Sequence, residues 1–200
     1  MKKQVDFIFD FASPNAYFSY KVLPKIVERS GATLNISPCL LGGIFKETGN
    51  QPPMVTFANV KGKMEYEMLE SERFMTLHGL TRFKFNSSFP VNTLLLMRGA
   101  LVAEVDGRLS EYVDAGLRSM WEDDKKMDDV EVFVSEMDAS GFNGEDIVKR
   151  TQDAEIKSRL IANTNAAVSR GVFGIPTFFV GNDMFFGKDR LHQVEEALKK

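Results

Sequence analysis

The stretch from Val5 to Tyr20, VDFIFDFASPNAYFSY, has the clearest structural pattern in the chain. Between Val5 and Phe11 aromatic and β-branched residues recur with a period of two, and apolar side chains occupy both parities, which predicts a buried strand. Ser13 and Pro14 end that strand, because serine is a favoured N-cap and proline suits the first turn of a helix. The chain therefore begins with a strand, a short turn and a helix that has a hydroxyl at its start.

Ser13 has two interpretations at this point. It is a plain helix cap, or it belongs to a binding site, because the N-terminus of a helix offers free N–H donors and a partial positive charge that favour an anion. The Ser-Pro pair alone favours the cap. The far end of the chain is needed to decide.

Composition limits the class of protein. The 200 residues, 44% of them apolar, suit one compact domain or a small domain with an insertion. The formal charge of −3 argues against nucleic acid and anionic membranes as partners. One cysteine and two histidines predict no internal disulfide and no tetrahedral metal site. With no membrane-length apolar run and no signal-peptide pattern at the start, we expect a soluble, cytoplasmic protein.

The rest of the chain divides into three parts. A helix from Ser13 to Ser30, which Pro24 should kink or divide, leads to a second strand over Thr33–Cys39, where Pro38 suggests a sheet edge or the end of the strand. A strand, helix and strand in this order predict a parallel pair. After a loop or broken helix, six helices are expected at about Lys61–His78, Asn92–Val105, Ser110–Trp121, Asp129–Ser140, Glu145–Thr151 and Asp153–Ser169.

Strand patterns return near the end of the chain. Thr177–Val180 and Met184–Phe186 form a predicted hairpin, and Asp189 is expected to cap a last helix, Arg190–Leu198. The order β-α-β, helices, β-β-α predicts an α/β protein with a thioredoxin-like fold interrupted by a large all-helical insertion. We place the thioredoxin-like domain at residues 1–40 and 165–200, and the inserted domain at 41–164. The charged run from Glu122 to Glu131 is expected to be a solvated loop and helix start.

Four stretches in this order resemble the family of 2-hydroxychromene-2-carboxylate isomerases and kappa-class glutathione transferases. Thioredoxin-like proteins carry Cys-x-x-Cys after the first strand, where this chain has Ser13-Pro14-Asn15-Ala16. The resemblance covers nearly the whole chain and favours a functional Ser13. The stretches are FDFASPNAY, LLGGIFKETGNQPP from Leu40 to Pro53, NSSFPVNTLLLMRG from Asn86 to Gly99, and RGVFGIPTFFVGNDMFFGKDRL from Arg170 to Leu191.

The resemblance implies glutathione as the cofactor, with its sulfur near Ser13. The hydroxyl would donate a hydrogen bond to the thiolate, and the helix N-terminus would add its field. A free thiol titrates near about 8.5, while a charged hydrogen bond is worth about 1.5–3 kcal/mol and a helix end about 0.3–1 kcal/mol. Those contributions are large enough to yield a thiolate at neutral pH without a neighbouring base.

The other site residues follow from the same resemblance. Ile175 and Pro176 match a cis-proline turn that offers backbone groups to the cysteinyl part of glutathione, although an ordinary strand-start proline is the alternative. Asp189 and Arg190 match the positions that hold the γ-glutamyl group, or else form a helix cap with an exposed neighbour.

The remaining candidates are expected to contact the substrate. Lys46 and Asn50 match a loop that reaches glutathione and substrate, while Asn86 and Trp121 are weaker candidates because an aromatic residue there also suits a core. Phe186 stands where tryptophan is common in the family. The single cysteine, Cys39, is expected to pack as a small buried residue.

The function implied is a glutathione-dependent isomerase that acts on 2-hydroxychromene-2-carboxylate-type substrates, which are small aromatic oxo or hydroxy acids. The thiolate would add reversibly, allow rotation about a bond and leave again. A kappa-like glutathione transferase and a non-catalytic thioredoxin-like binding module are the alternatives. Ser13 cannot form the mixed disulfide that a disulfide oxidoreductase needs. The resemblance also implies a homodimer.

Overall fold

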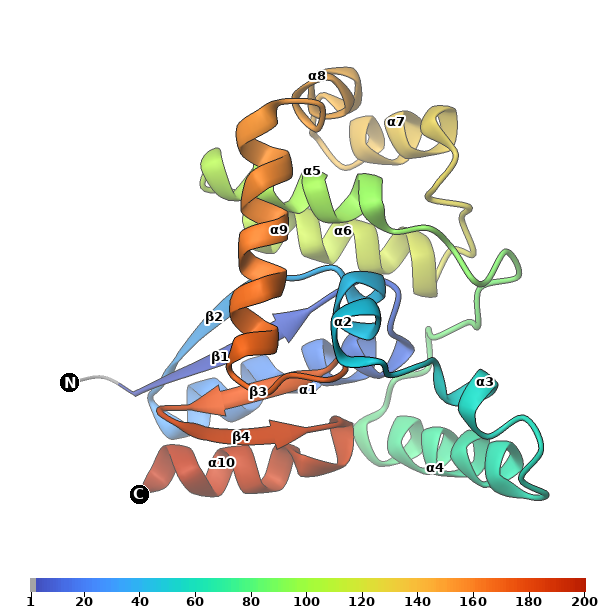
Figure 1. Ribbon diagram of the computed structural model, residues 1–200, viewed down its shortest axis with the longest axis vertical. Coiled ribbons are helices and arrows are strands. Elements are labelled where there is room, and N and C mark those ends of the chain that lie inside the picture. Colours follow the sequence, from blue (N-terminus) through green and yellow to red (C-terminus); the bar gives the residue numbers. More distant parts are fainter. Residues whose placement is uncertain (1–2) are drawn as a thin grey trace.

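The computed structural model describes residues 3–200 and has a four-stranded sheet with helices on both sides (Figure 1). The strands lie in the order β2-β1-β3-β4. β1 pairs in parallel with β2 and antiparallel with β3, and β4 pairs antiparallel with β3. Both the parallel pair and the edge position of Pro38 are as predicted. The strands are β1 Gln4–Phe9, β2 Thr33–Pro38, β3 Thr177–Val180 and β4 Asp183–Phe186.

The first helix, α1, runs from Pro14 to Ser30 with Ser13 as its N-cap. It ends where Gly31 takes a left-handed φ of 61°, a conformation that glycine adopts without steric cost. Pro24 lies inside α1, and the helix continues on both sides of it. Of the two outcomes expected at Pro24, a kink or a division, the helix is therefore not divided.

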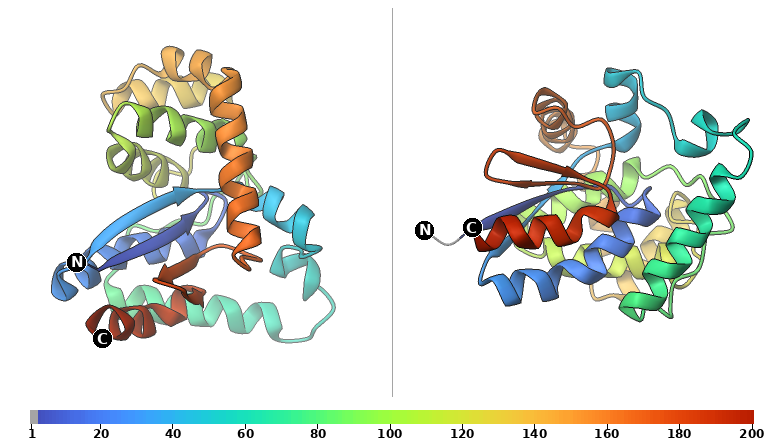
Figure 2. Two further views of the ribbon diagram at one scale, coloured as in Figure 1. Left: turned by 60° about the vertical axis from the view of Figure 1, so that its left-hand side comes forward. Right: turned by 90° about the horizontal axis from the view of Figure 1, so that it is seen from below.

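The segment after β2 is helical. The stretch expected as a loop or broken helix forms α2 and the short α3, and the expected exit from the insertion after residue 164 falls inside α9, which continues to Ser169. α9 crosses one face of the sheet and α1 and α10 cover the other, while α5 to α8 lie together beyond the β2 edge (Figures 1 and 2). The helices are α2 Leu41–Thr48, α3 Pro53–Thr56, α4 Lys63–His78, α5 Leu94–Val105, α6 Leu109–Trp121, α7 Val130–Ala139, α8 Gly144–Arg150 and α9 Ala154–Ser169.

The chain ends with a short 3-10 helix, η1 (Lys188–Arg190), and then α10 (Leu191–Lys199). The expectation that Asp189 caps the last helix is wrong, since Arg190 occupies the N-cap position. Gly187, with a φ of 91°, redirects the chain after β4, and the Arg190 N–H donates to its carbonyl at 3.1 Å. The tighter turn therefore places Asp189 one residue before the cap.

The core joins the sheet to the helices. Phe7 of β1 stacks on Phe178 of β3 with ring centroids 5.3 Å apart. Trp121 is fully buried beside Phe83, with ring planes 18° apart. Cys39 is fully buried as expected, and burial raises the pKa of its thiol to about 12. No helix in residues 3–200 is long and apolar enough to cross a membrane.

The run from Glu122 onward is not simply a solvated loop. The Glu122 side chain is only 4% exposed and accepts from Lys21 at 2.9 Å, Arg82 at 2.9 Å and the Tyr17 hydroxyl at 3.1 Å. Burial alone would raise the pKa of this carboxyl, but the hydrogen bond and charge of Lys21, with Tyr17 and Arg82, lower it overall. A buried carboxylate needs such partners, which come from α1 and the loop after α4.

Candidate active site

Ser13 joins the start of α1 to the turn before β3. Its side-chain oxygen accepts the Ala16 N–H at 3.2 Å and donates to the Ile175 carbonyl at 3.1 Å. The residue is only 5% exposed. The serine is thus both a helix cap and a contact between segments 162 residues apart in sequence.

The turn that receives this hydrogen bond contains a cis proline. The Ile175–Pro176 peptide bond is cis, as the family resemblance implied, and so is the unexpected Phe89–Pro90 bond. The Gly187 N–H donates to the Pro176 carbonyl at 2.9 Å, which brings the end of β4 to the same turn. Ser13, Ile175, Pro176 and the start of η1 therefore lie together.

Asn50 ties the end of α2 to the strand turn. α2 ends at Gly49, whose left-handed φ of 70° turns the chain, and the next residue, Asn50, donates from Nδ2 to the Phe173 carbonyl at 2.8 Å. Lys46 lies in the last turn of α2 and is exposed. Asn50 thus lies beside the cis-proline turn, and Lys46 projects from the same short helix.

Charged groups gather on η1. Asp189 is 62% exposed and Arg190 is also exposed, so both are accessible to a ligand. Sequence reasoning missed Lys188, whose side chain is only 3% exposed, with Nζ 3.4 Å from Asp189 and 5.7 Å from the Phe74 ring centroid. Its place just before Asp189 was the only signal, and nothing in the sequence predicted its burial against α4.

An exposed aromatic pair stands beside the cis-proline turn. Phe173 and Phe186 are 39% and 43% exposed, and their ring centroids are 4.5 Å apart. The Phe186 ring packs so closely over Gly174 that a Cβ there would come within 2.9 Å of it. The pair therefore forms an apolar surface fixed to the turn that Ser13 contacts.

Two predicted substrate residues lie in the interior instead. Asn86 is 1% exposed, donates to the carbonyls of Met120 and Lys125 at 2.8 and 2.9 Å, and accepts from Ser88. Trp121 is fully buried and donates from its indole nitrogen to the Phe11 carbonyl at 2.9 Å. The polar groups of both are used within the protein, which favours the structural interpretation over substrate contact.

Asp10 is a buried polar residue that the sequence reasoning did not single out. Its carboxylate is fully buried between β1 and the helices, and burial raises its pKa to about 6 against the opposing effect of its hydrogen-bond donors. An acidic residue inside a run of aromatic strand residues was the available signal.

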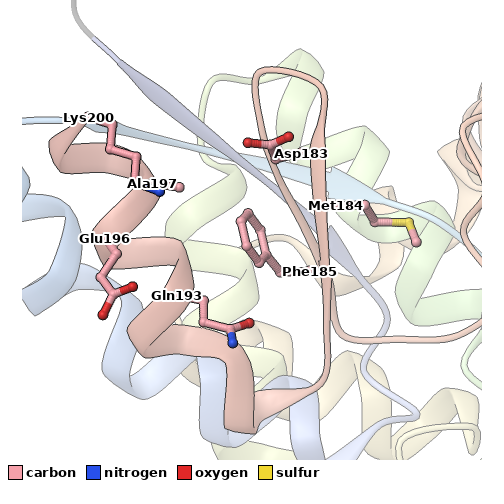
Figure 3. A pocket seen from close by; sticks show the side chains of 7 residues that line it. All are labelled: Asp183, Met184, Phe185, Gln193, Glu196, Ala197 and Lys200. Atoms are coloured by element: carbon pink, nitrogen blue, oxygen red, sulfur yellow. The ribbon is translucent and has the colours of Figure 1, made fainter.

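Other features of the surface do not add to this region. Within residues 3–200 no group of three or more His, Cys, Asp and Glu side chains is arranged to hold a metal ion. A shallow pocket lies between β4 and α10, lined by residues such as Asp183, Phe185, Gln193 and Glu196 (Figure 3). None of the predicted site residues lines it.

Comparison with known proteins agrees with this arrangement. The family of DSBA-like thioredoxin domains matches residues 4–199. The chain belongs to the DsbA-like thioredoxin family. It is 30% identical over 201 residues to a 2-hydroxychromene-2-carboxylate isomerase from Pseudomonas sp. strain C18, covering 97% of this chain and 89% of that one.

Further relatives place the chain within this DsbA-like family. It is 27% identical over 221 residues to glutathione S-transferase kappa 1 from Caenorhabditis elegans, with 98% of this chain and 91% of that one covered. A solved structure of a 2-hydroxychromene-2-carboxylate isomerase superposes with a TM-score of 0.84 at 26% identity, covering 98% of this chain and 94% of that one. The chain is thus a DsbA-like protein of the isomerase and kappa-transferase group, as its sequence motifs indicated.

Proposed function

We propose that the protein is a glutathione-dependent isomerase that acts on 2-hydroxychromene-2-carboxylate-type substrates. The observation that carries the proposal is the placement of Ser13, at the N-terminus of α1 and hydrogen-bonded to the residue before cis Pro176. The relatives named as isomerases and glutathione transferases support a glutathione-related enzyme. The only cysteine in the sequence, Cys39, is buried, so this site has the hydroxyl of Ser13 in place of a redox-active thiol.

The groups around Ser13 fit glutathione. A hydroxyl at a helix N-terminus suits a thiolate, and the exposed Asp189 and Arg190 suit the ammonium and carboxylate of a γ-glutamyl group. Asn50, already bonded to the Phe173 carbonyl, is near enough to the turn to add an amide contact. When bound, glutathione would supply the thiolate that adds reversibly to the conjugated substrate.

The role of Ser13 is to stabilise negative charge on sulfur. Its proton now points to the Ile175 carbonyl, so turning it toward a thiolate exchanges a neutral hydrogen bond for a charged one. Neutral bonds are worth about 1 kcal/mol and charged ones about 1.5–3 kcal/mol, and the helix end adds about 0.3–1 kcal/mol. The net effect is to lower the thiol pKa by about one to two, from about 8.5 toward neutrality. The freed Ile175 carbonyl can then accept a backbone N–H of the ligand.

The surroundings of the turn suit an aromatic acid. Phe173 and Phe186 offer exposed ring faces beside the site, and Lys46 provides an exposed cation on the helix that Asn50 links to Phe173. Aromatic rings stack on such surfaces with a gain of about 0.5–1.5 kcal/mol beyond area burial. These features support a planar substrate with a carboxylate.

A kappa-like glutathione transferase is the second candidate, supported by the kappa relatives at similar identity. Incubating the protein with glutathione and a 2-hydroxychromene-2-carboxylate separates the two functions. An isomerase returns the trans-hydroxybenzylidenepyruvate with free glutathione unchanged, and a transferase consumes the thiol into a conjugate. Glutathione binding without conversion of either kind would indicate a binding module instead.

The homodimer stays a prediction, and α4 offers a surface for it. Leu77 is 78% exposed and Met68 is 58% exposed on this helix, which buries only Phe74. Sedimentation velocity should therefore give a dimer mass for the wild type and a smaller mass for Leu77→Asp. A wild type that sediments as a monomer at all concentrations would contradict the prediction.

A further inference from the structure

The Asp10 carboxylate lies where three helices begin. Oδ1 accepts the Ala12 N–H at 2.9 Å and the Thr93 hydroxyl at 2.7 Å, and Oδ2 accepts the Leu41 N–H at 2.7 Å. Ala12 immediately precedes the N-cap of α1, Leu41 is the first residue of α2, and Thr93 is the N-cap of α5. A single side chain therefore connects the starts of α1, α2 and α5.

These connections join two parts of the candidate site. The Ala12 contact fixes the turn that carries Ser13, and the Leu41 contact fixes the start of α2, the helix that ends just before Asn50. α2 is only eight residues long, so a shift at its start is transmitted to Asn50. The other anchor at this end of α2 is the Thr164 hydroxyl, which accepts the Leu40 N–H at 3.0 Å.

We propose that Asp10 is a positioning residue, whose carboxylate holds the start of α2 against the turn of Ser13 so that Ser13 and Asn50 face one ligand. Asp10 is fully buried and does not itself touch the ligand. It acts through Ala12 and Leu41. The identity of the ligand in this inference rests on the proposed function. The anchor, by which we mean the hydrogen bonds from Ala12, Leu41 and Thr93 to Asp10, does not depend on that function.

The anchor requires the charged form of the carboxyl. A carboxylate accepts all three donors, whereas a proton on Oδ2 opposes the Leu41 N–H and a proton on Oδ1 weakens the bonds from Ala12 and Thr93. The isosteric Asp10→Asn has the same defect, since its NH₂ must face either Leu41 or Ala12. This variant is therefore a permanent copy of the protonated state.

Protonation of Asp10 falls within an accessible range of pH. Burial raises the pKa of the carboxyl to about 6, against the lowering effect of its three donors. Among the described residues, the charged side chains on the neighbouring helices do not shift the pKa of Asp10. These side chains include Lys46 of α2, Arg98 of α5 and Arg159 of α9. The titratable neighbour is Cys39, the residue after β2, and the charge of Asp10 helps to raise the pKa of its thiol.

Amide hydrogen exchange in the ligand-free protein tests the anchor without any assumption about function. After correction for the intrinsic pH dependence of exchange, protection of the Ala12 or Leu41 N–H should fall about tenfold as the pH drops through about 6. Asp10→Asn should have the low protection at every pH. Equal protection above and below pH 6, with Asp10→Asn matching the wild type, would overturn the proposal.

Two matched variants distinguish the loss of protection caused by protonation of Asp10 from a general loss of protection around α2. Thr164→Val removes the other anchor of α2 and no charge, so it should lower protection at Leu40 equally at all pH values and keep the step near pH 6. Thr93→Val removes a donor that lowers the pKa of Asp10, so it should move the step to higher pH. If the pH at which protection changes is the same in Thr93→Val as in the wild type, the change is caused by the titration of a group other than Asp10.

Titration calorimetry with S-methylglutathione tests positioning, because this probe has no thiol to ionise. Asp10→Asn should bind it about tenfold more weakly than the wild type at pH 7.5, which is about 1.4 kcal/mol, and equally at pH 5. A pH step in exchange with unchanged binding in Asp10→Asn would overturn the positioning role. If the wild type binds no probe while the step is present, the anchor stands and the proposed function fails.

Discussion

Ionisation of the buried Asp10 should have opposite effects on the site and on the stability of the fold. The ionised carboxylate holds the start of α2, but burying its charge lowers the free energy of unfolding. Its pKa rises from an ordinary 3.8 to about 6 in the folded chain, so the folded state binds the proton more tightly than the unfolded state. The free energy of unfolding therefore falls as the pH rises between about 4 and 6. The stabilising contribution is fully present below about pH 4 and lost above about pH 6.

The magnitude follows from the same two values. A difference of about two between folded and unfolded pKa corresponds to about 3 kcal/mol, at 1.36 kcal/mol for each pH unit. Asp10→Asn has no proton to lose. The free energy of unfolding of the variant minus that of the wild type should therefore grow by about 2–2.5 kcal/mol from pH 4 to pH 7, because the unfolded carboxyl is already about half ionised at pH 4.

Urea denaturation followed by circular dichroism at pH 4, 5, 6 and 7 measures this difference. Taking the difference between two chains removes the titration of every other group they share. Thr164→Val, which loses a neutral hydrogen bond to the same helix, should stay parallel to the wild type. A stability difference between Asp10→Asn and the wild type that is constant across this range would show that the carboxyl is not raised in pKa, and would refute the reasoning.

Three further substitutions test other parts of the structure. Ser13→Ala should raise the pKa of a bound glutathione thiol by about one, as seen by ultraviolet thiolate absorbance against pH, and identical titration curves would reduce Ser13 to a helix cap. Arg190→Ala should weaken glutathione binding by about 1.5–3 kcal/mol in calorimetry, whereas an unchanged Kd would make the residue plain surface. Glu122→Gln should lower the melting temperature at pH 7, and the difference should shrink as the pH falls through the lowered pKa of Glu122, because a depressed carboxyl stabilises only when ionised. A difference that does not change with pH would mean that the charge of Glu122 contributes nothing.

Local sequence patterns were sufficient for most of the fold. Period-two alternation located β1, and the Ser13 cap and Gly31 stop located both ends of α1. The order of the elements predicted the parallel pair of β1 and β2. These features depend on neighbours within a few residues, which is why a single sequence contains them.

The failures concern contacts between distant segments. Asp10 meets Thr93 across 83 residues, and Glu122 meets Tyr17 across 105, so neither carboxylate could be recognised as buried from its surroundings in sequence. Asn86 was a weaker site candidate because it lies in a family motif, and its amide nitrogen donates to the Met120 carbonyl, which favours a structural role. Resemblance identified stretches that matter without indicating whether a side chain in them faces a ligand or the core.

The pairing of β1 with β3 has a consequence for how the chain is made. β1 is one of the two inner strands, and it is complete by Phe9, but its antiparallel partner begins only at Thr177. After β2 is synthesised, a ribosome that adds about 5–20 residues per second needs on the order of 10 s to reach β3. During that time the second edge of β1 has no strand to cover it, and an open apolar edge invites pairing with other chains. The nascent protein therefore depends on its helices, or on a chaperone, to shield that edge until β3 emerges.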